Sequence, residues 1–581
     1  MLHNRKKFLK LQEEVLENIK KEVKTLLEKI PPSLSKYYQE YKKEFRRIES
    51  LSNKKELIEQ VLSSDIVYNG DFHTFEHAQR MALRILREII HMKKKIIFAT
   101  EVVLIKHQDI LNKFIAGKIS EKDFLKKIDY DQTWGFDWKN FKPLFDFARK
   151  YKIQVLALNS AQARGQLEIS KGSDIPRRDQ NAAEILAQAL KRYPGYLIYV
   201  LFGDLHLARN HLPTKVDRLV RPNPTRTIIY QNSETVYRKL AQMGKEHDID
   251  VVKLAKGVYC VNNATPWVKL QSYIHWREKV DAVQPRFSGA TFGFESEHIV
   301  DYTDQILHYL KVICHFLEIS PSGLEGFSVY TLDDLDFLDE LRKKLPRRHF
   351  SWIQKLVRSA KSFYVPRERL IYLSDLNINE AGENATQFLY TLLSGWNYFY
   401  LPLEFQFYSD IVRHALGFFG SKVINHKRKS EKLLDCEEFA HRSDLGSSER
   451  VLFKQTVAQA VINAKKREDE YLKTKKYEYP FKKYRSSGKL EMTNLKLGMT
   501  GRIEKSSKWR LIVVEASKIL GQMLGDRLYR GVIIGQISLE DVRKIFRKKM
   551  NSETAALSFY LLLIDELSSI RLVYKSRKEH L

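Results

Sequence analysis

The clearest pattern in the chain lies between residues 63 and 285, where short continuous apolar runs alternate with longer amphipathic stretches. Such apolar runs are typical of strands buried on both faces, and the amphipathic stretches have the spacing of helices. Strands that alternate with helices form a mostly parallel sheet covered by helices. The pattern therefore predicts an α/β domain with strands at 65–70, 94–101, 152–159, 196–203, 225–232 and 249–261, the last counted as one or two strands.

Two regions flank this predicted domain. Residues 1–62 have helical spacing on both sides of a Pro-Pro break, which predicts an N-terminal helical hairpin. Residues 290–581 lose the alternation and are interpreted as a large, mainly α-helical C-terminal region. Within it we expect a pair of helices over 496–529 and a basic, partly flexible linker at 464–490.

Polar residues stand at the ends of the predicted strands, where parallel sheets bind their ligands. Two strands end in the same pattern of glycine, aspartate, any residue and histidine, at 70–73 and at 203–206. Glycine permits a tight turn, and residues two apart in an extended chain face the same side, so each aspartate is expected to act with its own histidine. The side chains expected to converge on one crevice are Asp71, His73, Glu101, Asp204 and His206.

These residue types leave several chemistries open. Two carboxylates and two imidazoles suit a divalent metal ion, but they also suit acid–base chemistry without a metal. Alternatively, each aspartate merely caps the helix that follows it. The metal ligands predicted by the first interpretation are Asp71, His73, Asp204 and His206.

A second motif overlaps the first glycine–aspartate pattern. Residues 73–77 match H-x-x-E-H, the inverted zincin sequence, which requires both histidines inside a helix. His73 directly follows a strand, and this placement argues against a zincin. His77 can still reach the site, because it lies one helical turn beyond His73.

Several of these segments resemble those of a known family. GDFHTFEHAQR at 70–80 resembles the G-E-x-H opening of the ChaN-like haem-binding (uptake) domain family, in the Tiki, TraB and erythromycin-esterase superfamily. Glu101 resembles the glutamate after the family's second strand, and WGFDW at 134–138 is similar to its middle segment. Arg178-Asp179 and GDLHLARNHLP at 203–213 resemble the later blocks. The resemblance extends over about residues 63–240, with Asp71 where the family usually has glutamate.

The resemblance implies an α/β domain that binds haem, and the functional positions that it suggests are His73, Glu101, Arg178 and His206. With the nearby His77 added, the residues expected to bind haem are His73, His77, His206 and Arg178. Trp134 and Trp138 either wall a haem slot or belong to the core. Other branches of the superfamily are hydrolases, so a metal-dependent or acid–base hydrolase is the alternative. In that case Glu101 or His206 acts as general base and Arg178 stabilises an oxyanion, while Asp71 and Asp204 orient the histidines or bind metal.

Composition narrows the class of protein. Three cysteines in 581 residues exclude a disulfide scaffold, and no apolar run reaches the length of a membrane span. The amino terminus is charged throughout and has no apolar export segment. We therefore expect a cytoplasmic protein, with peripheral attachment to a membrane as the open alternative.

The net charge of +28 raises the question of an anionic partner. Residues 401–581 carry 14 of these excess positive charges, whereas residues 281–400 are slightly acidic. This distribution favours a partner of the C-terminal part, either an anionic surface or an acidic protein. Nucleic-acid binding is a third hypothesis that no recognisable module supports.

Overall fold

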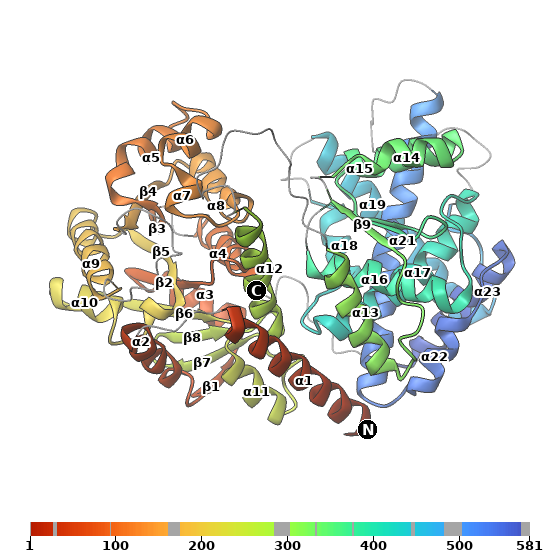
Figure 1. The fold of residues 1–581 in the computed structure, drawn as a ribbon, viewed down its shortest axis with the longest axis horizontal. Coiled ribbons are helices and arrows are strands. Elements are labelled where there is room, and N and C mark those ends of the chain that lie inside the picture. Colours follow the sequence, from red (N-terminus) through yellow and green to blue (C-terminus); the bar gives the residue numbers. More distant parts are fainter. Residues whose placement is uncertain are drawn as a thin grey trace. The chain divides into compact units, whose positions relative to one another are not determined.

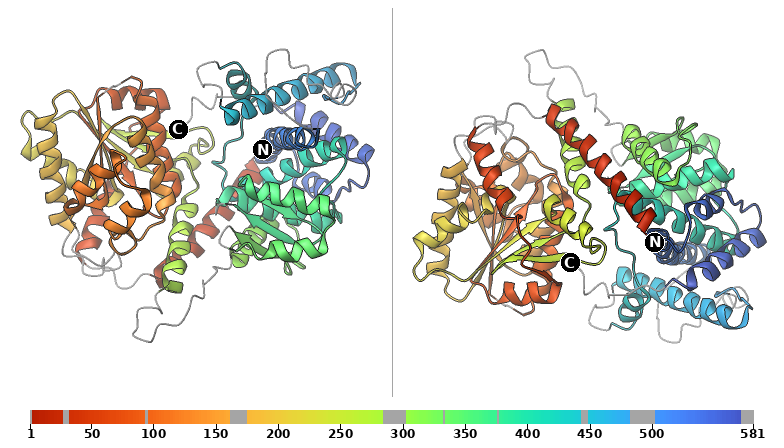
Figure 2. Two further views of the ribbon diagram at one scale, coloured as in Figure 1. Left: turned by 90° about the horizontal axis from the view of Figure 1, so that it is seen from above. Right: turned by 90° about the horizontal axis from the view of Figure 1, so that it is seen from below.

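The protein is described by a computed structural model that covers residues 2–26, 32–92, 95–160, 175–283, 302–331, 334–374, 377–442, 448–481 and 502–570. The chain divides into two compact units (Figures 1 and 2). We call residues 15–292 with 578–581 the sheet unit, and residues 1–14 with 293–577 the helical unit.

The sheet unit is built on eight strands in the order β1-β7-β8-β6-β2-β5-β3-β4. The pairings β1–β7 and β7–β8 are antiparallel, and all others in this sheet are parallel. The predicted mostly parallel sheet is therefore confirmed. The strands are β1 (Ser50–Ser52), β2 (Ile66–Asp71), β3 (Ile96–Leu104), β4 (Gln154–Asn159), β5 (Leu197–Gly203), β6 (Arg226–Gln231), β7 (Val251–Ala255) and β8 (Val258–Val261).

Helices cover both faces of this sheet, as the continuous apolar strands require. In β2, Val67 belongs to one apolar cluster, with α4 and α8, while Ile66 and Tyr68 belong to a second cluster, with α9 and α10. The helices of the sheet unit are α2 (Pro32–Lys43), α3 (Lys54–Leu62), α4 (Glu76–Ile89), α5 (Gln108–Ile115), α6 (Glu121–Lys127), α7 (Tyr130–Thr133), α8 (Trp138–Lys150), α9 (Ile175–Arg192), α10 (Leu212–Leu219), α11 (Glu234–Gln242) and α12 (Pro266–Val283), with the later part of α1 (Leu2–Leu26).

The helical unit is mainly α-helical, as predicted, but it also contains a small sheet of order β10-β11-β9. Two of its central helices pack closely against each other because glycines lie where they touch. A Cβ at Gly521, on one helix, would lie 2.5 Å from the carbonyl oxygen of Ile411, on the other. The elements are α13 (Thr303–Leu317), β9 (Ser328–Thr331), α14 (Phe337–Lys344), α15 (Arg347–Arg358), β10 (Phe363–Val365), β11 (Leu370–Leu373), α16 (Ile378–Ser394), α17 (Leu403–Ile424), α18 (Leu433–Ala440), α19 (Glu449–Thr474), α21 (Arg502–Ile533), α22 (Leu539–Arg547) and α23 (Glu553–Ser568).

Three local predictions were wrong. The expected pair of helices over 496–529 is a single helix, α21, from Arg502 onward, because its glycines serve close packing rather than a break. The expected linker is helical up to Thr474, where α19 carries the ion pair Arg467–Glu470 at 2.6 Å, and its part from 482 lies outside the described residues. Residues 50–52 form strand β1 rather than part of a helical hairpin.

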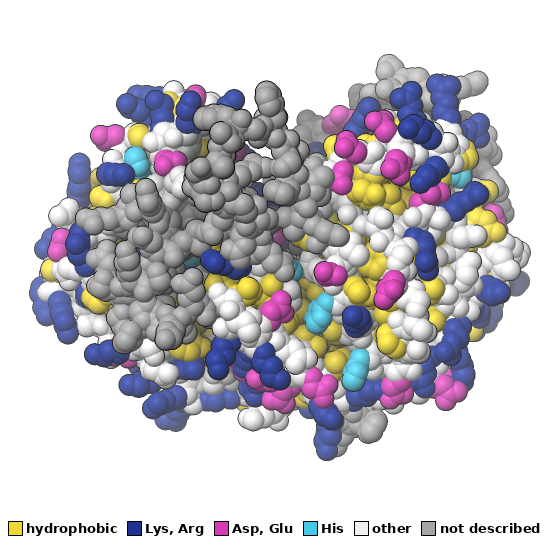
Figure 3. All heavy atoms as spheres, in the orientation of Figure 1, with side chains coloured by type: hydrophobic (Ala, Val, Ile, Leu, Met, Phe, Trp, Pro, Cys, Tyr) yellow, Lys and Arg dark blue, Asp and Glu magenta, His cyan; other side chains and the backbone are white. Residues whose placement is uncertain are grey.

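The surface carries both signs of charge. Figure 3 shows Lys and Arg spread over the visible face, with Asp and Glu between them. None of the described helices combines the length and the apolar character that a membrane crossing requires.

Candidate functional site

The first glycine–aspartate motif begins in the last two residues of the central strand β2. Asp71 is its last residue and lies opposite Gly203 of β5 in the parallel ladder. One Asp71 oxygen lies 2.7 Å from Nδ1 of His73, and the other accepts a hydrogen bond from Gln79 Nε2 at 2.5 Å. Both carboxylate oxygens are therefore engaged, and Asp71 orients its own histidine rather than capping α4.

The second motif has the same residue types in a different conformation. Strand β5 ends at Gly203, and Asp204 begins a 3₁₀ turn (Asp204–Leu207). The Asp204 carboxylate therefore turns away from His206 and accepts hydrogen bonds from Tyr41 Oη at 3.1 Å and Lys269 Nζ at 2.9 Å. The expected pairing of Asp204 with His206 does not occur, because the chain is no longer extended at Asp204.

His206 takes its carboxylate partner from helix α9 instead. Its Nδ1 lies 2.5 Å from Oδ1 of Asp179, whose Oδ2 accepts a hydrogen bond from Tyr37 Oη at 3.0 Å. Asp179 is completely buried, and Tyr37 belongs to α2. The sequence analysis assigned no role to either residue, although Asp179 directly follows Arg178, which was predicted to be a site residue.

Glu101, in the bulged part of β3, joins the two motifs. Its Oε1 accepts the backbone N–H of Gly203 at 2.5 Å and lies 3.6 Å from Nε2 of His73. Its Oε2 accepts a hydrogen bond from Arg178 at 3.1 Å. Glu101 is 2% exposed, so it is a buried carboxylate with cationic or N–H partners on both oxygens.

Gly203 lies where these groups meet. A Cβ at this position would be 3.2 Å from Glu101 Oε1, 3.4 Å from His206 Cδ2 and 3.6 Å from His73 Cε1. The missing side chain thus allows both histidines and the glutamate to share one edge of the sheet. The structure brings together Asp71, His73, Glu101, Arg178 and His206, and it directs the carboxylate of Asp204 elsewhere.

Aromatic rings border the His73 side of the site. Trp134 and Phe136 lie 4.7 and 4.9 Å from the His73 ring, and Trp276 stacks on Phe136 at 4.8 Å. Trp138 packs instead among the core rings of Phe114, Phe124 and Phe145. The WGFDW segment therefore contributes one tryptophan to the site and one to the core.

The Asp71–His73 pair retains protons more strongly than either group does in water. Burial raises the pKa of Asp71, although the bond with His73 opposes this shift. Burial alone would lower the pKa of His73, but Glu101 and Asp71 together raise it. His77 differs: burial and nearby arginines lower its pKa to about 3, and its ring stacks on Phe75 at 4.9 Å. It is a neutral side chain on the first turns of α4.

The described residues do not form a metal cage. In the part of the chain that the structure covers, no three His, Cys, Asp or Glu side chains are grouped so as to hold a metal ion. What the geometry offers is an imidazole, His206, whose Nδ1 is bonded to a carboxylate and whose Nε2 has no partner among the described residues.

Part of the sheet unit is similar to known proteins. The structure of ChaN of Campylobacter jejuni, with cofacially bound haem, is 11% identical, with a TM-score of 0.25 over 31% of this chain and 86% of that chain. No curated protein matches. Asp71, His73 and Glu101 lie within a segment that a family model matches, whereas Arg178, Asp179 and His206 lie beyond it. Residues 57–172 match the family of ChaN haem-binding uptake proteins in the Tiki superfamily.

Proposed function

We propose that the sheet unit binds haem at the carboxyl edge of its strands, where Nε2 of His206 would hold the iron. The proposal rests on the hydrogen bond between His206 Nδ1 and Asp179, at 2.5 Å. Histidines that ligate metals usually donate their other ring N–H to a carboxylate, which fixes the tautomer and the ring orientation. His73 is less suitable, because Asp71 and Glu101 face its two ring nitrogens.

Other side chains of the site fit a haem group. The rings of Trp134, Phe136 and Trp276 supply flat apolar surface of the kind that a porphyrin requires. Arg178 gives one bond to Glu101 at 3.1 Å, and its guanidinium has further N–H groups that can bind a propionate. Haem, when bound, would supply an iron centre whose reactivity depends on the side chain that holds it. The family match over residues 57–172 supports the same ligand.

The test is reconstitution of the full chain with hemin, followed by absorbance in the Soret region. We expect a saturable Soret shift that His206→Ala abolishes and His73→Ala weakens. His91→Gln is the control, because His91 is an exposed histidine that packs against Tyr151, outside the site. If His206→Ala keeps the wild-type spectrum and affinity, His206 is not the ligand and the proposal fails.

A hydrolase is the second candidate, because buried groups with perturbed pKa values, here Asp71 and His73, cluster in active sites. Glu101 or His206 would act as general base, and Arg178, already bonded to Glu101, would stabilise an oxyanion. Ester and peptide substrates, assayed with and without added divalent metal, test this candidate. Turnover that Glu101→Gln removes would favour it, and inert protein would exclude these substrate classes.

A further inference from the structure

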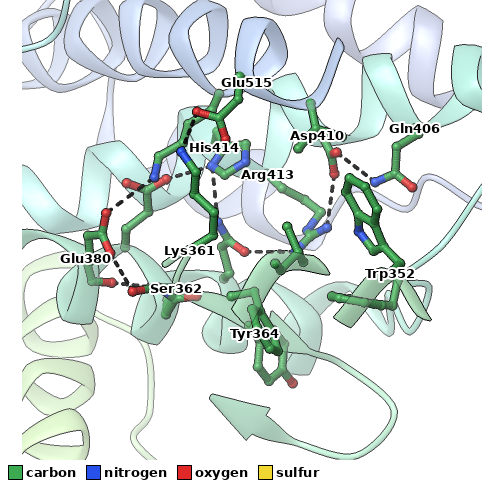
Figure 4. Close-up of a pocket in the computed structure, with 18 residues that line it drawn as sticks. Trp352, Lys361, Ser362, Tyr364, Glu380, Gln406, Asp410, Arg413, His414 and Glu515 are labelled. Atoms are coloured by element: carbon green, nitrogen blue, oxygen red, sulfur yellow. Dashed lines mark hydrogen bonds and ion pairs between the residues drawn. The ribbon is translucent and has the colours of Figure 1, made fainter. Parts of the chain in front are cut away.

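The helical unit contains a polar cavity that the proposed haem site does not use. Its volume is about 70 Å³, and it lies among β10, α15, α16, α17 and α21 (Figure 4). A volume of this size holds roughly five water molecules, or an organic group of comparable bulk. The lining includes four aromatic side chains, Trp352, Phe363, Tyr364 and Phe399, which we call the aromatic wall. The charged side chains of the lining, which carry both signs, are called the charged wall.

The carboxylates of this wall already have donors. Glu383 accepts from His414 Nδ1 at 2.7 Å and from Arg428 at 2.5 Å. Asp410 accepts from Arg413 at 3.1 Å and from Gln406 at 2.7 Å, as the dashed lines in Figure 4 show. The acidic side chains are therefore largely satisfied, although they line the cavity.

Glu380 and Glu515 complete the acidic side of the wall. Glu380 accepts the Ser362 hydroxyl at 2.5 Å, and Glu515 accepts Lys361 Nζ at 2.8 Å. Each of the four carboxylates thus has a hydrogen-bond donor on at least one oxygen.

The cations keep unused donors. An ammonium has three N–H groups, and a guanidinium has five. Lys518 Nζ pairs with Glu380 Oε1 at 3.5 Å, which is too long for a good hydrogen bond. Arg413 uses its two terminal nitrogens for Asp410 and Gln387, one bond each. Lys518 and Arg413 therefore bring N–H groups to the lining that the described hydrogen bonds do not use.

Lys518 carries its charge at neutral pH. Burial favours the neutral amine, but Glu380, Glu383 and Glu515 outweigh this effect and raise the pKa of Lys518. A charged ammonium with unused donors in a recessed site attracts anionic oxygen atoms.

We propose that this cavity binds a small organic anion, in which a carboxylate or phosphate group contacts Lys518 and Arg413 and a planar apolar body packs against the aromatic wall. The carboxylate and the phosphate share the required chemistry: anionic oxygens that accept from the unused donors. The ring wall of Trp352, Phe363 and Phe399 gives the site its preference for a flat body over inorganic ions. This site is independent of haem binding by the sheet unit.

Calorimetric titration of the full chain with benzoate, phenyl phosphate and the neutral analogue benzamide tests the proposal. We expect saturable binding of at least one anion and none of benzamide, and the stronger anion identifies the preferred group. Lys518→Met should weaken binding of that anion at least tenfold. Lys508→Met, on the same helix but paired with exposed Glu449 at 2.7 Å, should leave it unchanged.

Because Lys518 is partly buried, Lys518→Met requires a folding check by circular dichroism. A second variant, Trp352→Leu, keeps the cationic wall intact and should weaken the aromatic anions more than inorganic phosphate. Absence of saturable binding to the wild-type chain, or binding that neither variant changes, would overturn the proposal. The cavity would then be a hydrated ion-pair network.

Discussion

The two glycine–aspartate–x–histidine motifs have the same pattern but different structures. In the first, the strand includes the aspartate, so Asp71 stays extended and contacts His73 two residues later. In the second, the strand stops at Gly203, so Asp204 enters a 3₁₀ turn and contacts Tyr41 and Lys269. The strand ends one residue earlier within the second motif than within the first, and this difference changes which carboxylate each histidine contacts.

The comparison shows that a repeated motif is not a repeated site. His73 belongs to a network that is closed by Asp71 and Glu101, whereas His206 is held by Asp179 through one nitrogen. In the function proposed above, the first arrangement retains a proton, and the second leaves Nε2 of His206 available to the haem iron.

The largest effect is expected from the glycine of the first motif. A Cβ at Gly70 would lie 1.8 Å from Asp204 Oδ1, and Asp204 is short and held by two partners. Gly70→Ala should lower the free energy of unfolding by about 3 kcal/mol, in the range of overpacked cores. Gly203→Ala, with 3.2 Å to Glu101 Oε1, should cost less. Urea denaturation of both variants checks the order, and equal losses would contradict it.

The next prediction separates the two carboxylates that flank the second motif. Asp179→Asn should lower haem affinity about tenfold to a hundredfold, because it removes the carboxylate that orients His206. Asp204→Asn should leave haem affinity unchanged, since Asp204 does not contact His206. Hemin titrations followed in the Soret region provide the measurement. A stronger effect at Asp204 would reverse the assignment.

Two tyrosines of α2 give a smaller and matched pair of effects. Tyr37 donates to Asp179 and Tyr41 donates to Asp204. Loss of either hydroxyl should reduce stability by about 1 kcal/mol, the usual net value of a hydrogen bond. Tyr37→Phe should also weaken haem binding, by less than Asp179→Asn does, whereas Tyr41→Phe should not. Thermal denaturation and hemin titration together distinguish the two variants.

The smallest effect concerns pH. His73 has a raised pKa in the folded chain, so its contribution to stability is fully present below 6.5 and is lost as pH rises through the folded value. The contribution of Asp71, whose pKa is also raised, is present below 3.8 and is lost as pH rises. The urea midpoint of the wild type should therefore fall above pH 6.5, and that of His73→Gln should fall less. Parallel pH profiles would show that His73 does not hold the proton.

Much of the sheet could be predicted because its strands are buried on both faces and read as apolar runs. Strand β1 was missed because Ser50–Ser52 has a single apolar residue and pairs at the edge of the sheet. The strands of the small second sheet have three or four residues, too few to show a period between long helices.

The site residues that could be predicted are those at the ends of parallel strands, where ligands usually bind. That rule selected Asp71, His73 and Glu101, which the fold places together. Asp179 lies on a helix, and its approach to His206 depends on how α9 packs on the sheet. Tyr37 and Tyr41 come from a helix more than 130 residues before their partners, a contact that local sequence does not encode.

Helix α1 places the start of this chain in both units. Its residues up to Glu14 belong to the helical unit, where Phe8 packs against Phe316, His426 and Tyr529, each at 5.8 Å between ring centroids. During synthesis Phe8 leaves the ribosome hundreds of residues before Tyr529. The ring contacts of Phe8 can therefore be completed only after the sheet unit and most of the helical unit have been synthesised.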